Sequence, residues 1–293
     1  TADATEYFEG LLSTLYEPEF DEKVYDLMLS GPLTDTVGLR FSARIREYGG
    51  FMEDLFQKMD GPQYDQETYR LKINWQATDA TKVSLKAEIG SFDSLGRQAE
   101  IINDEPSTSD VFLFTGKTEA EILDNTQFPG IVNVDTDESV LNNYQDYKTA
   151  TNGNYSNNDT TNLTLNITNI TEGGHEFTSI TGYMHYEYND LCDCDATPAE
   201  LFKLELGEDY SQFSQELRWV SPANNEIEYI GGIYMQRNDL DFRDKLIQDS
   251  AVVVQLLNAA DYTEGGARGD VDPNPLGGSV EEILGIGDAG NAV

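Results

Sequence analysis

Few residues of this chain have the types and spacings that metal binding requires. Its two histidines, His175 and His185, are ten residues apart, which is about 33 Å along an extended strand and too far for one metal ion. Two acidic groups offer the oxygen ligands that Ca²⁺ prefers, but neither has the glycine and terminal glutamate of a complete calcium loop. These groups are Asp190, Asp193 and Asp195, and Asp270 and Asp272 beside Asn274. We therefore expect solvated acidic loops and no metal site.

Catalytic chemistry is equally sparse. The sequence contains no hydrolase elbow, phosphate loop or metalloprotease motif. Cys192 and Cys194 are separated by one residue, so a disulfide between them would close a very small ring and be strained. Without histidine or further cysteine the pair is also a poor zinc site. We expect an exposed loop without function, with a strained or redox-active disulfide as the alternative, and no catalytic residue, cofactor or enzyme activity.

The most informative charged residues are cations in the stretch GLRFSARIRE (Gly38–Glu47). Apolar residues alternate there with polar ones, and three of the 18 Lys and Arg fall on the polar parity. A period of two predicts a β-strand with one apolar and one charged face. In a soluble sandwich those faces meet a core and water, whereas in a membrane barrel they meet lipid and a polar lumen. This strand alone is compatible with both.

The same alternation recurs along the chain. It is clear near 38–47, 69–76, 82–89, 162–168, 212–219 and 226–236, and weaker near 6–16, 22–30 and 175–189. The pattern predicts about nine antiparallel strands and no amphipathic helix. We predict that the charged residues on the polar parity line an interior; they are Arg40, Arg44, Arg46, Arg70, Lys72, Lys82, Lys86, Glu216 and Arg218.

The connections between these strands alternate in length. Short ones lie at 30–36, 77–81, 171–174 and 221–226, and long ones at 49–66, 92–158, 190–209 and 239–293, with 17–21 as the one short member of the second set. The four long segments hold 34 of the 54 acids but 8 of the 18 Lys and Arg, hence 26 of the 36 excess negative charges. Outer-membrane barrels have short periplasmic turns on one rim and long extracellular loops on the other, whereas soluble domains rarely contain such long loops.

Two further features restrict the class of protein. Trp75 and Trp219 both fall on the apolar parity, two residues before a short turn, where a periplasmic aromatic girdle would lie. A net charge of −36 and a pI near 4.1 exclude nucleic acid as a partner, because phosphate binding needs clustered cations. The best apolar run, Ala251–Leu257, is far shorter than the roughly 20 residues of a membrane helix.

Three stretches resemble the barrel of TonB-dependent outer-membrane receptors. SGPLTDTVGLRFSARIREYGGFMED resembles the early barrel, with its Gly-Pro-Leu turn and Arg-bearing strand. FSQELRWVSPANNEIEYIGGIYMQ resembles the mid-barrel, where a Gln-Glu-Leu-Arg strand precedes a Ser-Pro turn, and FTSITGYMHYEYND resembles the strand before it. The three occur in family order and together cover nearly all of 6–238.

The resemblance implies a 22-stranded, up-and-down antiparallel transmembrane barrel with long extracellular loops, closed by an N-terminal plug. About nine strands cannot enclose such a pore. We expect 1–293 to be a single-domain fragment of the barrel, with strands over roughly 6–238, an extracellular loop at 239–293, and no plug or C-terminal strands. We also predict that the cations of 37–48 and 67–77 meet acceptors on the plug.

The resemblance also implies a function. The protein would import a scarce, bulky solute of the siderophore, vitamin or oligosaccharide class across the outer membrane of a Gram-negative bacterium. Its partners would be the TonB complex, acting through the plug, and outer-membrane lipid and lipopolysaccharide. Two alternatives remain: a secreted or surface β-rich adhesin or glycan-binding module, and a passive porin.

Overall fold

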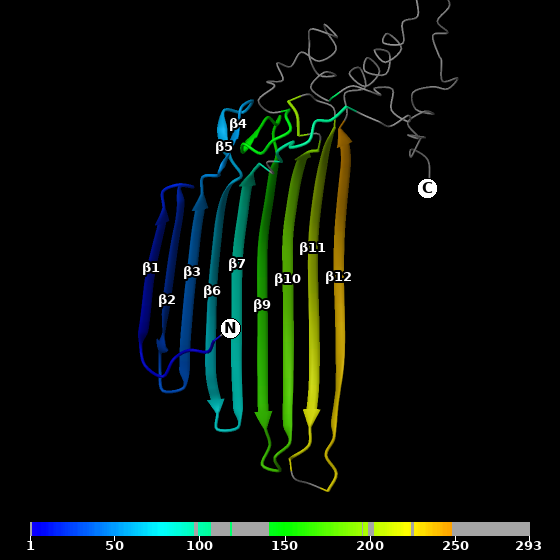
Figure 1. The fold of residues 1–293 in the computed structure, drawn as a ribbon. Helices are drawn as coiled ribbons and strands as arrows, with labels where there is room; N and C mark the ends of the chain where they lie inside the picture. Colours follow the sequence, from blue (N-terminus) through cyan, green and yellow to red (C-terminus); the bar gives the residue numbers. More distant parts are fainter. Residues whose placement is uncertain are drawn as a thin grey trace, which may run out of the picture.

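The protein is dominated by a single layer of β-strands (Figure 1). The structure, a computed structural model, describes residues 2–96, 99–106, 118, 141–194, 196–198, 202–223 and 226–247. Nine strands form one sheet in the order β1-β2-β3-β6-β7-β9-β10-β11-β12. Each strand pairs antiparallel with its neighbour along the chain, so the sheet is an up-and-down meander, as predicted. Within the described part of the chain there is no helix long and apolar enough to cross a membrane.

The strand bounds follow the alternating pattern. The nine strands are β1 (Glu9–Glu17), β2 (Glu22–Pro32), β3 (Val37–Tyr48), β6 (Gln63–Thr78), β7 (Thr81–Leu95), β9 (Tyr155–Ile170), β10 (Glu176–Asp193), β11 (Lys203–Val220) and β12 (Ile230–Ile247). A three-stranded sheet consists of β4 (Met52–Asp54), β5 (Met59–Gly61) and β8 (Lys148–Thr149).

Several sequence-based boundaries are wrong, because β6, β7 and β9 extend into the loops expected at 49–66 and 92–158, and two further differences are larger. The segment 190–209, expected as a long loop, is largely strand, because β10 continues to Asp193 and β11 begins at Lys203. The strand expected to end near 238 continues as β12 to Ile247. In both places polar and apolar residues still alternate. Charged residues, however, occupy the positions that are apolar elsewhere in the sheet, and such a composition is typical of a loop. Residues 248–293 lie outside the described part of the chain.

The connections alternate in length as predicted. Short connections join β2 to β3, β6 to β7, β9 to β10 and β11 to β12 at one end of the sheet (Figure 1). The opposite end has the turn between β1 and β2 and the three longer connections, and the small sheet of β4, β5 and β8 lies there. We call these the short-turn end and the loop end.

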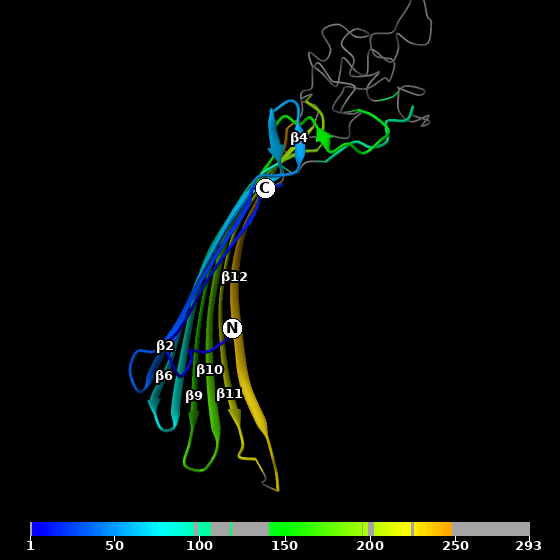
Figure 2. The ribbon, with the colours of Figure 1, turned by 60° about the vertical axis from the view of Figure 1, so that its left-hand side comes forward.

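The sheet is curved (Figure 2), and its two faces differ in exposure. On β6, β7, β9, β10 and β11, nearly all exposed positions share the parity of Leu71 and Ile73, while the opposite parity is mostly half-buried. This is the difference expected between a convex and a concave face. The apolar parity therefore forms the convex face, and the parity of Arg40 and Lys72 forms the concave face.

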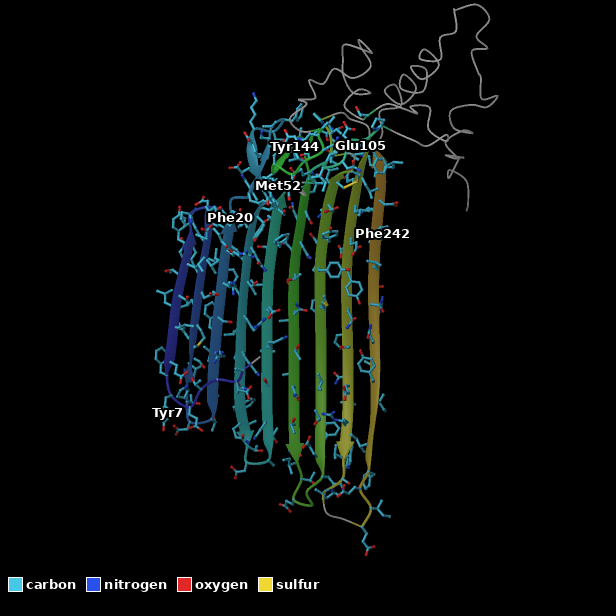
Figure 3. The ribbon with its side chains drawn as sticks, viewed as in Figure 1. Tyr7, Phe20, Met52, Glu105, Tyr144 and Phe242 are labelled. Carbon is cyan, nitrogen blue, oxygen red and sulfur yellow. A yellow bond between two sulfur atoms is a disulfide. The ribbon has the colours of Figure 1, made fainter. Side chains whose placement is uncertain are left out.

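No second layer packs against the convex face in the described structure. Among all described residues, the buried hydrophobic side chains are Val24, Met52, Leu141 and Ala150. Leu85, Leu163, Phe213 and Leu217, among others, are exposed, and Figure 3 shows the side chains of the sheet with no second layer of strands over them. A soluble domain of this size would bury such residues in a core.

The edge strands β1 and β12 each pair with a single strand and not with each other. Exposed apolar side chains lie along both edges, including Leu12 and Leu15 on β1 and Leu240 and Phe242 on β12. The described sheet is therefore an open wall rather than a closed barrel.

Candidate functional site: the concave face

The register places all nine predicted interior residues on the concave face. Arg40, Lys72 and Lys86 are direct partners across β3, β6 and β7, so three cations form one row. Arg44, Arg46, Arg70 and Lys82 occupy other rows of the same face on these strands. The remaining two, Glu216 and Arg218, lie on β11, where Arg218 is opposite Thr178. Like charges directly opposite one another are destabilising, so the row of three cations needs anionic neighbours to be stable.

Other cations of the concave face pair with carboxylates of the sheet itself, most of them on the adjacent strand. Arg46 Nε lies 2.6 Å from Glu22 Oε1 on β2, and Arg70 on β6 pairs with Glu88 on β7. Arg44 is 3.7 Å from Asp26, and Arg218 is 3.9 Å from Glu216. The wall thus provides several of its own counter-ions.

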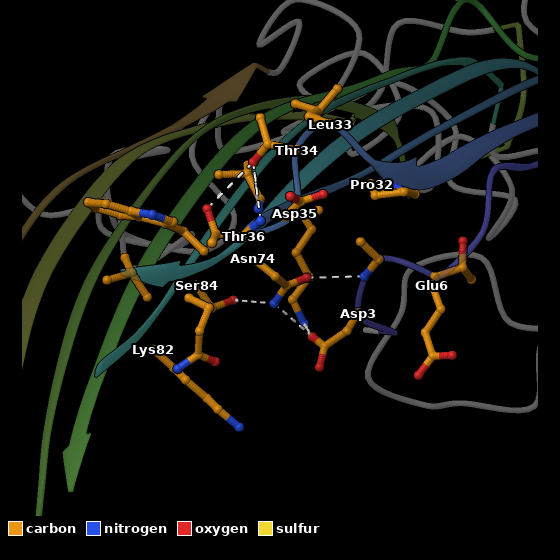
Figure 4. Close-up of a pocket in the computed structure, with 18 of the residues that line it drawn as sticks. Asp3, Glu6, Pro32, Leu33, Thr34, Asp35, Thr36, Asn74, Lys82 and Ser84 are labelled. Carbon is orange, nitrogen blue, oxygen red and sulfur yellow. Dashed lines mark hydrogen bonds and ion pairs between the residues drawn. The ribbon is translucent and has the colours of Figure 1, made fainter. Parts of the chain in front are cut away.

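The N-terminal segment provides another. Lys72 Nζ lies 2.5 Å from the Asp3 carboxylate, and Asn74 donates to Asp3 and accepts from the Ala4 amide, each at 3.1 Å (Figure 4). The Lys72 side chain is only 14% exposed. The hydrogen bond from Lys72 holds the pKa of Asp3 below its usual range. For Arg40, Lys82 and Lys86 no ion pair is formed with the residues that the structure describes.

A wide hollow of about 1140 Å³ lies between this segment and the wall (Figure 4). Its lining mixes polar and apolar residues and comes from the N-terminal segment, the β2–β3 turn, β6, β7 and β9. Lys82, Asn74 and Ser84 contribute donors, and the buried Asn166 Oδ1 accepts no hydrogen bond from a described residue. The hollow can take up a polar or anionic surface.

Aromatic residues gather on the convex face at the short-turn end. Trp75 and Trp219 are 46% and 45% exposed, so neither is covered by protein. Trp219 lies 6.4 Å from the Phe177 ring and 5.6 Å from that of His175, whose Nε2 is 3.0 Å from Tyr229 Oη. Such an exposed amphipathic band is typical of a membrane interface.

Residues at the loop end are held together by the buried carboxylate of Asp54. It accepts hydrogen bonds from the amides of Phe56, Gln57 and Thr151 and from Thr151 Oγ1. β4 also pairs with β8 in parallel, and Thr149 Oγ1 donates to the Ala99 carbonyl. These bonds join the β3–β6 connection to the distant end of the β7–β9 connection, and we call the joined segments the cap.

The two cysteines and the acidic residues beside them lie at the loop end of β10. Cys192 and Cys194 form a disulfide, contrary to the expected pair of loop thiols, because β10 extends to Asp193 and the β10–β11 turn brings them together. Asp190 and Asp193 are buried rather than solvated. The described residues contain no group of three potential metal ligands; Asp195, Asp270, Asp272 and Asn274 lie outside the described part of the chain. His185 contacts Asp209 and Glu187 instead.

A set of aromatic residues that was not predicted from the sequence lies on the concave face near the loop end. Tyr48 and Tyr64 stack with centroids 4.8 Å apart, and Phe92 follows at 5.8 Å. On the other side of β9, Tyr186 stacks on Tyr210 at 5.2 Å. Their signal in the sequence is an aromatic residue on the polar parity of a strand, where neither lipid nor a protein core explains it.

No protein-family model matches the chain, and no curated protein is similar to it in sequence. Among solved structures, the ferric yersiniabactin uptake receptor FyuA from Yersinia pestis is similar, with a TM-score of 0.54 and 14% sequence identity. The match covers 85% of this chain and 33% of the receptor, so this chain spans about a third of its length. This chain, whose described part is all-β, therefore shares its fold with about a third of this uptake receptor.

Proposed function

We propose that this chain forms part of the wall of an outer-membrane receptor that imports a scarce, bulky solute with energy from the TonB complex. The main support is the single-layered, curved sheet, with uncovered apolar side chains on its convex face and cations on its concave face. Lipid is the environment in which such a convex face is stable. The structural likeness to an uptake receptor agrees with this function.

In this proposal the sheet is one sector of a larger closed barrel, for which 22 strands is the number that the sequence resemblance implies. The edges of β1 and β12 would be completed by further strands, because an unpaired edge in lipid leaves backbone groups unsatisfied. A plug in the lumen would lie against the concave face. The Lys72–Asp3 contact illustrates how a segment crossing that face supplies carboxylates to its cations.

The loop end would be extracellular and the short-turn end periplasmic, with lipopolysaccharide around the outer rim. Trp75 and Trp219 would then mark the periplasmic interface. The cap and the acidic segments of the longer connections would surround the entrance through which the solute arrives. In this arrangement the protein has no catalytic role.

Fractionation and uptake test the proposal together. Cells expressing the full receptor gene should contain this chain in the detergent-extracted outer membrane. They should accumulate one of a set of ferric siderophores, cobalamin and neutral oligosaccharides, and lose that uptake when TonB is deleted. Recovery of the chain in buffer alone would favour the adhesin or glycan-binding alternative. Uptake that persists without TonB would favour a passive porin.

A further inference from the structure

Four cations of the concave face gather around one hollow near the N-terminal segment. The hollow has a volume of about 590 Å³, and its lining includes Arg40 and Arg44 from β3 and Arg70 and Lys72 from β6. Asp26 on β2 is the only carboxylate among the described residues that line it. The four cations share the parity of the concave face, so their side chains enter the hollow from one side of the sheet.

The register arranges these cations in three successive rows. In each row a residue of β3 lies directly opposite a residue of β6, and the pairs are Arg40 with Lys72, Ser42 with Arg70, and Arg44 with Thr68. Rows on one face of a strand are two residues apart, or about 6.6 Å, so the positive charge extends over about 13 Å along the strands. The hydroxyl groups in these rows are additional hydrogen-bond donors.

The cations are accessible from the lumen side. The side chain of Arg44 is 56% exposed and that of Arg70 is 37% exposed. Arg40 is half-buried on the same face. A ligand in the hollow can therefore reach guanidinium groups from all three rows.

The wall compensates this positive charge only in part. Arg40 forms no ion pair with a described residue, and Arg44 lies 3.7 Å from Asp26, beyond hydrogen-bonding distance. The carboxylate beside Lys72 is that of Asp3, which belongs to the N-terminal segment and not to the wall. Because a half-buried cation without a counter-ion is costly, the hollow favours an anion.

The number and kind of donors favour phosphate over a single carboxylate. A carboxylate offers two oxygens and one negative charge, whereas a phosphate ester offers three oxygens and a charge of about −1.5 to −2 at pH 7. Guanidinium groups bind phosphate through two parallel N–H···O bonds. Three guanidinium groups and one ammonium group, supplied by two strands, therefore match a phosphate better than they match one carboxylate.

The acidic connections at the loop end lie too far away to prevent such binding. β3 ends there at Tyr48, four residues or about 13 Å beyond Arg44 and eight residues or about 26 Å beyond Arg40. Both distances exceed the Debye length, which is about 8 Å at physiological ionic strength. Repulsion of an anion in the hollow is therefore largely screened by salt.

We propose that this hollow binds the phosphate group of a phosphorylated solute. The inference rests on the proposed function in that the concave face is taken to be a solute path, and it narrows the class of solute. Asp3 occupies Lys72 while the solute is absent, so the solute displaces this carboxylate. The acceptors expected on a plug are the competing occupants of the hollow.

The test is equilibrium binding by the full receptor, purified in detergent and phosphate-free buffer, with titration calorimetry as the readout. Inorganic pyrophosphate and glucose 6-phosphate should bind, and glucose should not. Arg40→Gln and Arg44→Gln should each weaken pyrophosphate affinity about tenfold through loss of charge-assisted hydrogen bonds. Arg218→Gln, which removes a concave-face cation outside the hollow, should leave affinity unchanged. Asp3→Asn should strengthen binding, because Lys72 is then released for the ligand.

Other outcomes overturn the inference. If protein with an intact circular dichroism spectrum binds neither phosphorylated probe, and Arg40→Gln lowers its melting temperature, the hollow belongs to a plug acceptor. Tighter binding of citrate than of pyrophosphate would assign the hollow to carboxylates. Equal weakening by Arg218→Gln and Arg40→Gln, or no gain from Asp3→Asn, would also contradict the site.

Binding and transport fail separately in these measurements, because binding is recorded without membrane energy. Uptake that does not depend on TonB, with pyrophosphate binding retained, would contradict the proposed transport and leave the phosphate site standing. TonB-dependent uptake of a solute without phosphate, with no pyrophosphate bound, would do the reverse.

Discussion

Ile73 and Lys72 are adjacent in the chain, yet their side chains lie on opposite faces of β6. If the convex face meets lipid, Ile73→Arg places a charge in hydrocarbon and should destabilise the folded protein by about 2–4 kcal/mol near the bilayer midplane. Denaturant titration in lipid vesicles measures this free energy of unfolding. Asn162→Arg is the matched control, because Asn162 lies on the concave face directly opposite Glu88. An equal cost for both variants would contradict the assignment of faces.

Asp3 gives a prediction on pH dependence. Its pKa is lowered in the folded state by the hydrogen bond from Lys72, so the contact stabilises the segment above the ordinary carboxyl pKa of about 3.9 and is lost as pH falls through the lowered value. A spin label at Glu6→Cys should therefore become more mobile only below about pH 4. With Asp3→Asn added it should be mobile at every pH, whereas Glu9→Gln should change nothing. A label whose mobility is the same in all three proteins would contradict the contact.

Among the elements of the structure, the cap is the part that a single substitution should loosen. Asp54→Ala removes the acceptor of several buried hydrogen bonds, each worth about 1–3 kcal/mol when a partner is left unsatisfied. Amide exchange in 52–57 and 148–151 should then accelerate at least about tenfold, while β6 and β9 stay protected. The exposed Asp60, on β5, supplies the control as Asp60→Ala. Unchanged exchange in the cap would show that Asp54 does not hold it together.

Elements also show what the sequence can and cannot predict. Strands such as β3 and β7 were predictable because apolar and polar residues alternate cleanly along them. The continuation of β12 was not, because Asp239, Asp241 and Arg243 occupy the convex parity there while Leu240 and Phe242 occupy the concave one. Alternation still operates, but with its usual polarity reversed, and charge density then resembles a loop. The cap was likewise unpredictable, since Asp54 and Thr151 are brought together only by tertiary structure.

The same reasoning explains the outcome for the site. Face membership of the nine charged residues follows from parity alone, and parity is readable in the sequence. Contacts between strands require register, so the Arg46–Glu22 pair and the Tyr48–Tyr64 stack emerged only from the structure. The disulfide between Cys192 and Cys194 is not the pairing that the sequence favours, because the ring it closes is so small.

The proposed function requires one property of the whole molecule, namely that the sheet separates lipid from an aqueous interior. In the described part of the chain the convex face is uncovered and few hydrophobic residues are buried, and in the proposed function lipid stabilises that face. The open edges of β1 and β12 and the likeness to a third of an uptake receptor are consistent with a sector of a larger wall. The stability of the sheet and of its open edges depends on which solvent the two faces meet.

The most direct measurement of that property is a spin-label scan of residues 69–76 on β6, with the protein in outer-membrane vesicles. Accessibility to oxygen, which concentrates in lipid, and to a water-soluble nickel chelate is recorded at each position. We predict that oxygen accessibility peaks at 69, 71, 73 and 75, and that nickel accessibility peaks at 70, 72, 74 and 76. Equal access of the nickel chelate to both sets of positions, as in a soluble sheet, would contradict the account.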